Sequence, residues 1–334
     1  MDMNNIYLFV FGLILLIKGG DWFVDSASGI ARRFKLPELL IGATVVSIGT
    51  TLPEVMVSAT AAIDGVGGMA YGNAIGSIIC NTSLIAATTI AIKPGKVAKK
   101  ALITPVCFFF AAAIFYSLTA YIGGHFSRVT GIILLSGFVV YMALTVVQML
   151  RDRKNGVELA ESGEDEEASE EAPAPIFKSI LFLIIGAAVI AVGADLLVDN
   201  GIAIAAAIGV PETVISLTFV ALGTSLPELV TAITALMKGH GALSLGNIIG
   251  ANLFNLVLVS GVATTILPFD VPAGTTVGGT PMSFIVDIPV MLAVMAIMVI
   301  PALIRGKLSR VQGIALLTIY AAFCAVQFVL PMVL

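Results

Sequence analysis

Apolar residues fill this chain in long, nearly uninterrupted stretches, separated by short segments that carry most of the charge. Each stretch reaches the length of about 20 residues that an α-helix needs to cross a lipid bilayer. The pattern predicts an all-α polytopic membrane protein with ten transmembrane helices in two groups of five. They fall at roughly 5–30, 37–63, 69–92, 101–122 and 128–150, and at roughly 177–204, 211–237, 242–267, 282–304 and 310–331.

The composition supports this class. Hydrophobic residues make up 58% of the chain and charged residues only 11%, whereas a soluble domain carries about a quarter charged residues. The mean hydropathy is +1.07, so the solvent must be lipid. The three cysteines lie in apolar stretches and predict no disulfide framework. The first apolar run has no basic segment before it, so we expect a membrane helix and not a cleaved signal peptide.

The basic residues predict the orientation, because cytoplasmic connections are enriched in Lys and Arg. With the N-terminus outside, the inside connections hold 15 of the 17 basic residues, namely Arg32, Arg33, Lys35, Lys93, Lys96, Lys99, Lys100, Arg151, Arg153, Lys154, Lys178, Lys238, Arg305, Lys307 and Arg310. Only Arg128 then falls outside, and Lys18 lies within the first helix. We therefore expect a multi-pass protein of the cell inner (plasma) membrane with both termini outside.

The linker between the two groups of helices is strongly acidic and is expected in the cytoplasm. It contains Glu158, Glu161, Glu164, Asp165, Glu166, Glu167, Glu170 and Glu171. Such a composition is typical of a disordered, solvated tether. A divalent-cation sensor is the alternative, but the spaced ligands and turn glycine of a calcium-binding loop are missing. The chain thus divides into a first five-helix repeat (1–150), an acidic cytoplasmic linker (151–175) and a second five-helix repeat (176–334).

The two groups of helices are copies of each other, offset by 174 positions without a gap. The offset aligns polar residues that an apolar bias would not align by chance: Asp21 with Asp195, Glu54 with Glu228, Asn73 with Asn247 and Asn81 with Asn255. Because each copy has an odd number of helices, the second copy must enter the membrane from the opposite side. Inverted repeats are typical of secondary transporters, whose site lies at the midplane between the repeats. A duplicated scaffold without transport is the alternative.

The second helix of each repeat carries the motif Gly-Thr-x-Leu-Pro-Glu, with its acid near the middle of the span. Positions 47, 50, 51 and 54 share one helical face. That face therefore carries the side-chain oxygens of Ser47, Thr50, Thr51 and Glu54, and the second motif has Ala221, Thr224, Ser225 and Glu228 at the same positions. A carboxylate at this depth costs a few kcal/mol unless it is paired, protonated or neutralised by a cation. Oxygen ligands without nitrogen or sulfur favour hard cations such as Na⁺ and Ca²⁺. A packing hydrogen bond from a protonated acid is the alternative.

The proline of each motif is expected to free a backbone carbonyl. Pro53 has no N–H, so the carbonyl of Gly49 loses its helical partner, and Pro227 does the same to Gly223. Unwound carbonyls inside a membrane are tolerated only beside protein or an aqueous cavity. We expect them to add acceptors to the same face.

The third helix of each repeat carries Gly-Asn-x-x-Gly. The glycine pairs, Gly72 with Gly76 and Gly246 with Gly250, have the spacing that lets helices approach closely in lipid. Asn73, Ser77 and Asn81 follow at intervals of four and would face the acid-bearing helix. We expect Asn81 and Asn255 to be cation ligands, and Asn73 and Asn247 less so. The alternative is that the asparagines only join helices.

Together these motifs, in both halves of a ten-helix chain, resemble the cation/calcium antiporter superfamily, and within it the prokaryotic sodium/calcium exchangers. The resemblance covers nearly the whole chain. The proton/calcium branch typically reads Gly-Asn-x-x-Glu, where this chain has Gly76 and Gly250, which argues against that branch.

The resemblance implies a secondary antiporter that uses a sodium gradient to export Ca²⁺ by alternating access, with the first and sixth helices sliding across the others. It implies no enzyme activity and no cofactor. Ca²⁺ and Na⁺ would be substrates and the lipid bilayer the surroundings, with no nucleic acid and no obligate protein partner. The implied ligands are Ser47 and Ala221 (both through the carbonyl), Thr50, Thr51, Glu54, Ser77, Asn81, Thr224, Ser225, Glu228, Ala251 and Asn255.

This sequence departs from the family pattern at two positions. Ala251 stands where a serine hydroxyl is usual, and Ile78 replaces an asparagine that survives as Asn252. Some members also have Asp at the place of Asn255. The two glutamates give the site a fixed charge of −2, which one Ca²⁺ or two Na⁺ would neutralise.

Other interpretations stay open from the sequence. A proton-coupled or other-divalent antiporter could use the same scaffold, and a passive cation channel or an intramembrane aspartyl protease is more remote. Paired acids also occur in the first and sixth helices, as Asp21, Asp25, Asp195 and Asp199. They would either line an ion pathway or bind helix ends and basic loop residues. Glu38 and Glu212 follow prolines at helix starts and are expected to be caps.

Overall fold

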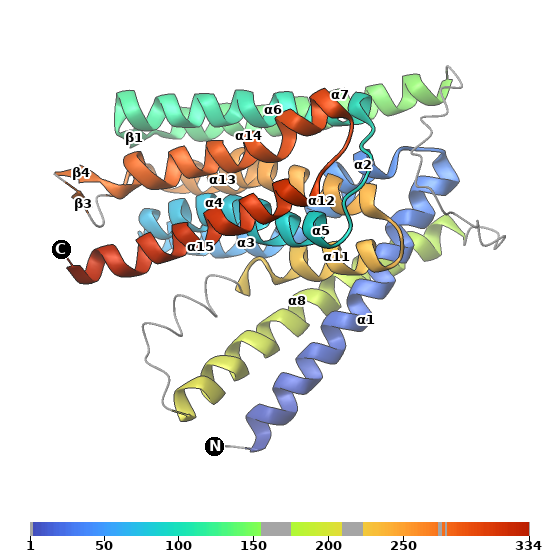
Figure 1. The fold of residues 1–334 in the computed structure, drawn as a ribbon, viewed down its shortest axis with the longest axis horizontal. Coiled ribbons are helices and arrows are strands. Elements are labelled where there is room, and N and C mark those ends of the chain that lie inside the picture. Colours follow the sequence, from blue (N-terminus) through green and yellow to red (C-terminus); the bar gives the residue numbers. More distant parts are fainter. Residues whose placement is uncertain (1–2, 155–174, 209–222, 273–275, 278, 334) are drawn as a thin grey trace.

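The protein, seen here as a computed structural model that describes residues 3–154, 175–208, 223–272, 276–277 and 279–333, is built almost entirely of helices (Figure 1). The α-helices are α1 (Met3–Phe34), α2 (Glu38–Ile41), α3 (Ser47–Ile63), α4 (Gly67–Cys80), α5 (Ala87–Ile92), α6 (Lys99–Leu118), α7 (Arg128–Lys154), α8 (Ile176–Ala207), α11 (Leu226–Met237), α12 (Gly241–Phe254), α13 (Ser260–Ile266), α14 (Ile288–Arg305) and α15 (Arg310–Val333). The π-helical segments are η1 (Gly42–Val46), η2 (Asn81–Ala86), η3 (Thr119–Gly123), η5 (Asn255–Val259) and η6 (Ser283–Asp287). The strands are β1 (His125–Phe126), β2 (Phe269–Asp270), β3 (Thr276–Val277) and β4 (Thr280–Pro281).

The helices confirm the polytopic, all-α class. Within the described residues, nine spans are long and apolar enough to cross a membrane: Met3–Phe34, Glu38–Ile63, Gly67–Ile92, Lys99–Gly123, Arg128–Arg151, Ile176–Ile204, Gly241–Ile266, Ser283–Arg305 and Arg310–Gln327. Each coincides with a predicted span to within a few residues. The remaining span, predicted at 211–237, lies partly outside the described residues, and its described part contains the apolar helix α11.

Loops that the predicted topology places on the same side of the membrane meet in the structure. At one end of the bundle, β1 pairs antiparallel with β2, with His125 opposite Asp270. At the other end, Lys96 forms an isolated backbone bridge with Lys307. Strands β3 and β4 form a separate short hairpin. Which end faces the cytoplasm stays a prediction from the basic residues.

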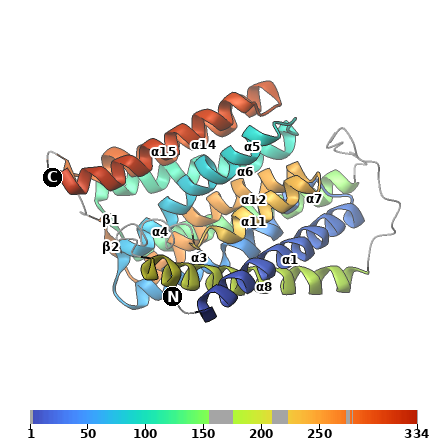
Figure 2. The same ribbon diagram turned by 60° about the horizontal axis from the view of Figure 1, so that its bottom comes forward.

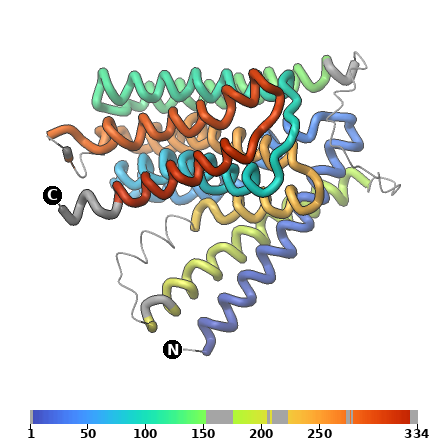
Figure 3. Tube along the Cα trace, in the orientation of Figure 1, coloured from blue at the N-terminus to red at the C-terminus, as the bar shows by residue number. Residues whose placement is uncertain are grey.

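Helices α1 and α8 lie side by side (Figures 1 and 2). They cross the other helices at a steep angle (Figure 1). Glycines allow this close pairing. A Cβ added at Gly12 would lie 2.8 Å from the carbonyl oxygen of Gly193, and one added at Gly186 would lie 2.8 Å from the backbone nitrogen of Phe23. The N-terminal end of α1 and the C-terminal end of α8 lie on the same side and diverge from the bundle (Figure 3).

The other end of α1 is anchored to the turn between α11 and α12. Lys238 Nζ lies 2.7 Å from Asp25 Oδ1 and 3.1 Å from Asp21 Oδ1. Beside this pair, the Glu38 carboxylate accepts a hydrogen bond from Ser28 at 2.7 Å and lies 2.8 Å from His240 Nδ1. Of the two roles expected for Asp21 and Asp25, the structure shows the binding of a basic loop residue and not the lining of an ion pathway. Glu38 is the first residue of α2, but Pro37 is the N-cap and the Glu38 carboxylate binds Ser28 and His240. Glu212 lies outside the described residues.

Replacing Lys238 by Met is expected to loosen this anchor only slightly. Exposed ion pairs contribute about 0–1 kcal/mol, and the Asp25 side chain is 60% exposed. Partial burial lowers the pKa of Lys238, but its hydrogen bonds to Asp25 and Asp21 outweigh this and raise it overall. A raised lysine pKa means that the stabilisation is present below the ordinary pKa of lysine and is lost only as pH rises through the raised value. Thermal unfolding of both proteins in detergent should therefore give a small difference that is constant between about pH 6 and pH 9. A difference that grows across this range would contradict the assignment.

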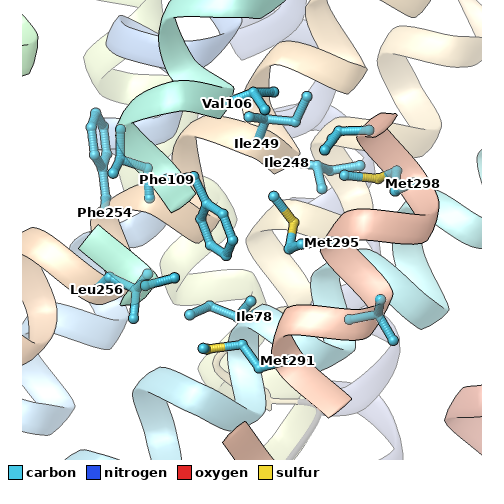
Figure 4. Close-up of a cluster of buried hydrophobic side chains, with 14 of the residues drawn as sticks. Ile78, Val106, Phe109, Ile248, Ile249, Phe254, Leu256, Met291, Met295 and Met298 are labelled. Carbon is cyan, nitrogen blue, oxygen red and sulfur yellow. The ribbon is translucent and has the colours of Figure 1, made fainter. Parts of the chain in front are cut away.

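Helix α12 is the centre of the bundle, with every residue from Leu243 to Phe254 buried. Its apolar side packs against α4, α6 and α14 in one hydrophobic cluster, where Ile248 and Phe254 lie near Phe109 and Met295 (Figure 4). Its opposite side faces α2, η1 and α3. A helix surrounded by protein on all sides can hold polar groups at membrane depth that a lipid-facing helix could not.

Candidate cation site

The first Gly-Thr-x-Leu-Pro-Glu motif lies on α3, directly after the π-helical segment η1. Ser47, Thr50, Thr51 and Glu54 are all buried, and Glu54 is fully shielded from solvent. The predicted shared face therefore points inward, toward α12 and α13 and away from lipid. The motif leaves Leu52 exposed on the opposite side.

The second motif begins α11. Ser225 precedes the first helical residue, Pro227 lies in the first turn, and Glu228 follows it. Ser225 and Glu228 are buried, and Thr224 is partly buried. Ala221, the remaining ligand expected from this motif, lies outside the described residues.

The expectation that the proline unwinds the helix is wrong for the first repeat. Helix α3 continues through Pro53 without a break. Proline in a helix removes one hydrogen bond, and the neighbouring turns can hold the helical path. The carbonyl oxygen of Gly49 still lacks the hydrogen bond that an N–H at position 53 would donate. The backbone irregularity lies upstream instead, at η1. In the second repeat, a turn at Thr224 and Ser225 precedes the helix that contains Pro227.

The predicted asparagine ligands occupy equivalent places in the two repeats. Asn81 begins η2 after α4, and Asn255 begins η5 after α12. Each segment contacts the acid-bearing helix of the other repeat, η2 with α11 and η5 with α3. A π-helical turn often marks a functional site, because it widens the helix locally and redirects side chains. Both asparagines are fully buried, and Ser77 is buried one turn before Asn81.

These elements bring the two motifs together in the middle of the bundle. Helix α3, which carries Glu54, contacts α11, which carries Glu228. The Glu228 carboxylate lies beside the side chains of Thr50 and Thr51. Ser225 lies against Cys80, the residue before Asn81. The structure therefore groups residues that the sequence separates by 174 positions.

The buried oxygens of this group lack protein partners. Both carboxylate oxygens of Glu54 and Glu228 have no hydrogen-bond partner within the described structure, and neither do the Thr51 and Ser225 hydroxyls or the side-chain amides of Asn81 and Asn255. Buried polar groups are nearly always paired, and an unpaired buried carboxylate is especially costly. A cluster of unpaired oxygens around two acids is the arrangement that a desolvated cation would satisfy.

The chemistry of the donors selects the kind of cation. Over the part of the chain that the structure describes, no three His, Cys, Asp or Glu side chains gather as a metal site. Two carboxylates surrounded by hydroxyl and amide oxygens suit hard cations that take six to eight oxygen ligands, such as Ca²⁺, or Na⁺ with fewer. Soft transition metals would prefer the nitrogen and sulfur ligands that this group lacks.

The glycine pairs of the third helices behave differently in the two repeats. A Cβ at Gly246 would lie 2.1 Å from the carbonyl oxygen of Leu39, and one at Gly250 would lie 2.2 Å from Ser47 Oγ. Close helix approach is therefore confirmed for the second repeat. For the first repeat it stays a prediction, because a Cβ at Gly72 or Gly76 would meet nothing within 4 Å among the described residues. The segment that the repeat offset pairs with Leu39 and Ser47 lies in 209–222, outside the described residues.

The first asparagines of the two Gly-Asn motifs also differ. Asn73 donates to the Glu54 carbonyl oxygen at 3.2 Å and to Ser58 Oγ at 2.9 Å. Asn247 instead accepts a hydrogen bond from Thr50 at 3.1 Å. In neither residue are the amide oxygen and the amide nitrogen both unpaired, as they are at Asn81 and Asn255 within the described structure. Both therefore support the acid-bearing helix, a role that the sequence leaves open.

The two departures from the family pattern differ in whether they affect the group around the acids. Ile78 lies in the apolar cluster near Phe109 and Met291 (Figure 4). Asn252, its repeat partner, donates to Thr82 Oγ1 at 2.7 Å and to Met295 Sδ at 3.2 Å. Neither side chain takes part in the group around the two acids. The loss of a hydroxyl at Ala251 is the departure that changes the group itself.

One polar residue near the site escaped the sequence pattern. Thr231 follows Glu228 by one helical turn, is fully buried, and its hydroxyl has no partner within the described structure. The first repeat has Val57 at the same place, so the repeat comparison gave no signal. A lone threonine in a membrane helix usually bonds to its own backbone.

Comparison with known proteins agrees with this geometry. A family model described as "Sodium/calcium exchanger protein" matches residues 4–147 and 178–329. The chain is 32% identical to the sodium/calcium exchanger MaX1 of Methanosarcina acetivorans, over 97% of this chain and 98% of that protein. It is 34% identical to the putative antiporter CaxA of Alkalimonas amylolytica, over 99% of each. A solved structure of the sodium-calcium exchanger NCX_Mj, soaked with 2.5 mM Na⁺ and 10 mM Sr²⁺, superposes with a TM-score of 0.78 at 33% identity, covering 98% of this chain and 99% of that one.

Proposed function

Because the chain belongs to the sodium/calcium exchanger family, we propose that it exchanges Na⁺ for Ca²⁺ and normally exports Ca²⁺. The family consists of transporters, so the protein is a multi-pass cation/Ca²⁺ antiporter and not an enzyme. Its ions are substrates and not cofactors. The sodium coupling and the direction of transport are the proposed part.

The observation that carries the proposal is the pair of buried, unpartnered carboxylates. Glu54 and Glu228 come from opposite repeats, and all four of their oxygens lack partners within the described residues. Together they supply a charge of −2, which one Ca²⁺ or two Na⁺ would neutralise. We place the Ca²⁺ between these two acids, with Thr50, Thr51, Thr224, Ser225, Ser77, Asn81 and Asn255 and the carbonyls of Ser47 and Ala221 as further ligands.

Shared ligands provide the coupling between the two ions. Na⁺ at flanking positions would use some of the oxygens that Ca²⁺ needs, so the two ions exclude each other. The carrier then binds either ion but not both at once. Because it changes access only when the acids are neutralised, each crossing carries one kind of ion, and the two ions are exchanged. The hydroxyl missing at Ala251 makes the flanking positions unequal, since the first repeat keeps Ser77.

The paired helices α1 and α8 are the proposed moving element. Their tightest packing is against each other, through glycines, and their contacts with the bundle are made mostly with α11. A pair that is rigid internally and loosely attached can shift as a unit with small changes in contact energy. Access would then alternate around the acids, which stay fixed on α3 and α11.

The proposed setting is the plasma membrane, with both termini outside and the acidic linker inside. The support is the positive charge of the inside connections. The proposed division into repeats 1–150 and 176–334 around the linker 151–175 rests on the offset of 174 positions.

The decisive experiment is ⁴⁵Ca²⁺ uptake into vesicles that contain the purified protein and are loaded with Na⁺. We expect Ca²⁺ to accumulate above equilibrium when Na⁺ is diluted outside, and not when Na⁺ is equal on both sides. Uptake that is driven by a pH gradient in the absence of Na⁺ would replace sodium coupling with proton coupling. Uptake that never exceeds equilibrium under any gradient would indicate a passive channel.

A further inference from the structure

The backbone of α12 packs closely around Asn247 against α2, η1 and the start of α3. The glycines on either side, Gly246 and Gly250, leave no space for a Cβ against Leu39 and Ser47. Asn247 is completely buried at this contact. Its position is therefore fixed by backbone packing between the repeats and does not depend on a flexible side chain.

Asn247 lies next to the hydroxyls of two of the proposed ligand residues, Thr50 and Ser47. Thr50 Oγ1 donates to the Asn247 side-chain oxygen at 3.1 Å. Ser47 Oγ lies 2.9 Å from the Asn247 backbone carbonyl oxygen and 2.7 Å from that of Gly42. A hydroxyl has one hydrogen and two lone pairs. When the hydrogen of Thr50 points at Asn247, both lone pairs of the Thr50 oxygen can face a cation.

Without Asn247 the Thr50 hydrogen would have a competing acceptor. The Glu228 carboxylate lies beside Thr50, and the next acceptor is the Ser47 carbonyl at 3.5 Å, beyond good hydrogen-bond length. A hydroxyl that turns to a carboxylate makes a strong charge-assisted bond. It would then occupy a carboxylate lone pair and turn its own lone pairs away from the cation.

We infer that Asn247 is a positioning residue for transport. It holds the Thr50 hydroxyl hydrogen away from Glu228, so that the Thr50 oxygen and the Glu228 carboxylate are free to bind the cation. The inference rests on the proposed function of the two acids. A residue of the second repeat would thus orient the hydroxyl of a ligand residue in the first repeat. Among the described residues Asn73 makes no equivalent contact with the second repeat, since its amide nitrogen donates to the Glu54 carbonyl and to Ser58.

The first test is Asn247→Ala, measured as Na⁺-driven ⁴⁵Ca²⁺ uptake over a range of Ca²⁺ concentrations. The Ca²⁺ concentration for half-maximal uptake should rise about tenfold, as expected for losing one hydrogen bond at a charged site. The maximal rate should stay within about twofold of the original protein. A role in folding alone would lower the amount of active protein, and hence the maximal rate, and leave the half-maximal concentration unchanged.

Asn252→Ala is the matched control. Asn252 is on the same helix and equally buried, but its amide binds Thr82 and Met295 and not the group around the acids. This variant should lower thermal stability without changing the Ca²⁺ concentration for half-maximal uptake. Equal shifts in the two variants would overturn the inference, since any buried asparagine of α12 would then have the same effect.

A double-mutant cycle tests whether Asn247 acts through Thr50. Thr50→Val alone should raise the half-maximal Ca²⁺ concentration about tenfold, and adding Asn247→Ala should raise it no further. Multiplied effects in the double variant would overturn the inference, because Asn247 would then act independently. If Asn247→Ala does not fold, Asn247→Asp serves instead. It keeps the acceptor oxygen, so Thr50→Val should cost as much in that background as in the original protein.

The inference and the proposed function fail in different ways. Loss of transport in Glu54→Gln, together with an unchanged half-maximal concentration in Asn247→Ala, would remove only the role of Asn247. Full transport in Glu54→Gln would remove the proposed site itself.

Discussion

Replacing Glu54 by Gln should reduce Na⁺-driven Ca²⁺ uptake by at least about a hundredfold, because the affinity of oxygen sites for Ca²⁺ depends steeply on the number of charged ligands. Gln has nearly the same shape as Glu, so the packing of α3 should survive. The charge of the group falls from −2 to −1, and one carboxylate oxygen becomes an N–H₂ donor that repels a cation. The measurement is ⁴⁵Ca²⁺ uptake into Na⁺-loaded vesicles, normalised to the amount of folded protein.

Glu228→Gln should have a similar effect, because the two acids come from equivalent positions of the two repeats. Asp64→Asn is the matched control, since Asp64 lies exposed in the turn after α3 and its replacement removes the same charge from the same chain. It should transport at close to the original rate. Full exchange by either glutamine variant would show that the carboxylate in question does not bind the transported Ca²⁺.

A second large effect is expected where Gly246 of α12 contacts Leu39 of α2. Gly246→Ala places a methyl group 2.1 Å from the Leu39 carbonyl oxygen, 2.8 Å from its carbonyl carbon and 2.9 Å from its Cα. All three are backbone atoms, so the two helices must separate. Overpacking of this kind costs about 1–3 kcal/mol or more, and here it also displaces Asn247 and Ser47. We expect a clear fall in the thermal unfolding temperature in detergent and a loss of Ca²⁺ affinity.

Gly72→Ala is its natural control, because the repeat offset pairs Gly72 with Gly246. A Cβ at Gly72 meets nothing within 4 Å among the described residues. Alanine is also the better helix former. The variant should therefore unfold within about 0.5 kcal/mol of the original protein. Equal destabilisation by the two substitutions would contradict the structural difference between the repeats.

Hydropathy alone establishes the class of protein, and motif content predicts the chemistry of its site. Membrane spans are predictable because lipid demands about 20 apolar residues for each crossing, whatever their neighbours are. The acids at positions 54 and 228 stand out for the same reason, since a charge at that depth needs a partner. Their place in a repeated motif also links them to each other, although 174 positions separate them. The helices lie where the hydropathy predicts them, apart from the part of 211–237 that is not described.

Which contacts the equivalent residues of the two repeats make depends on the tertiary structure. The glycines and first asparagines of the two Gly-Asn motifs are identical in sequence. Gly246 and Asn247 nevertheless contact the opposite repeat, whereas among the described residues a Cβ at Gly72 would meet nothing within 4 Å and Asn73 binds within its own repeat. The partner of Asp21 and Asp25 is Lys238, which is remote in the chain. Hydropathy and motif spacing describe one helix at a time. Which side chain meets which depends on how helices from the two repeats cross, and a local pattern carries no record of that crossing.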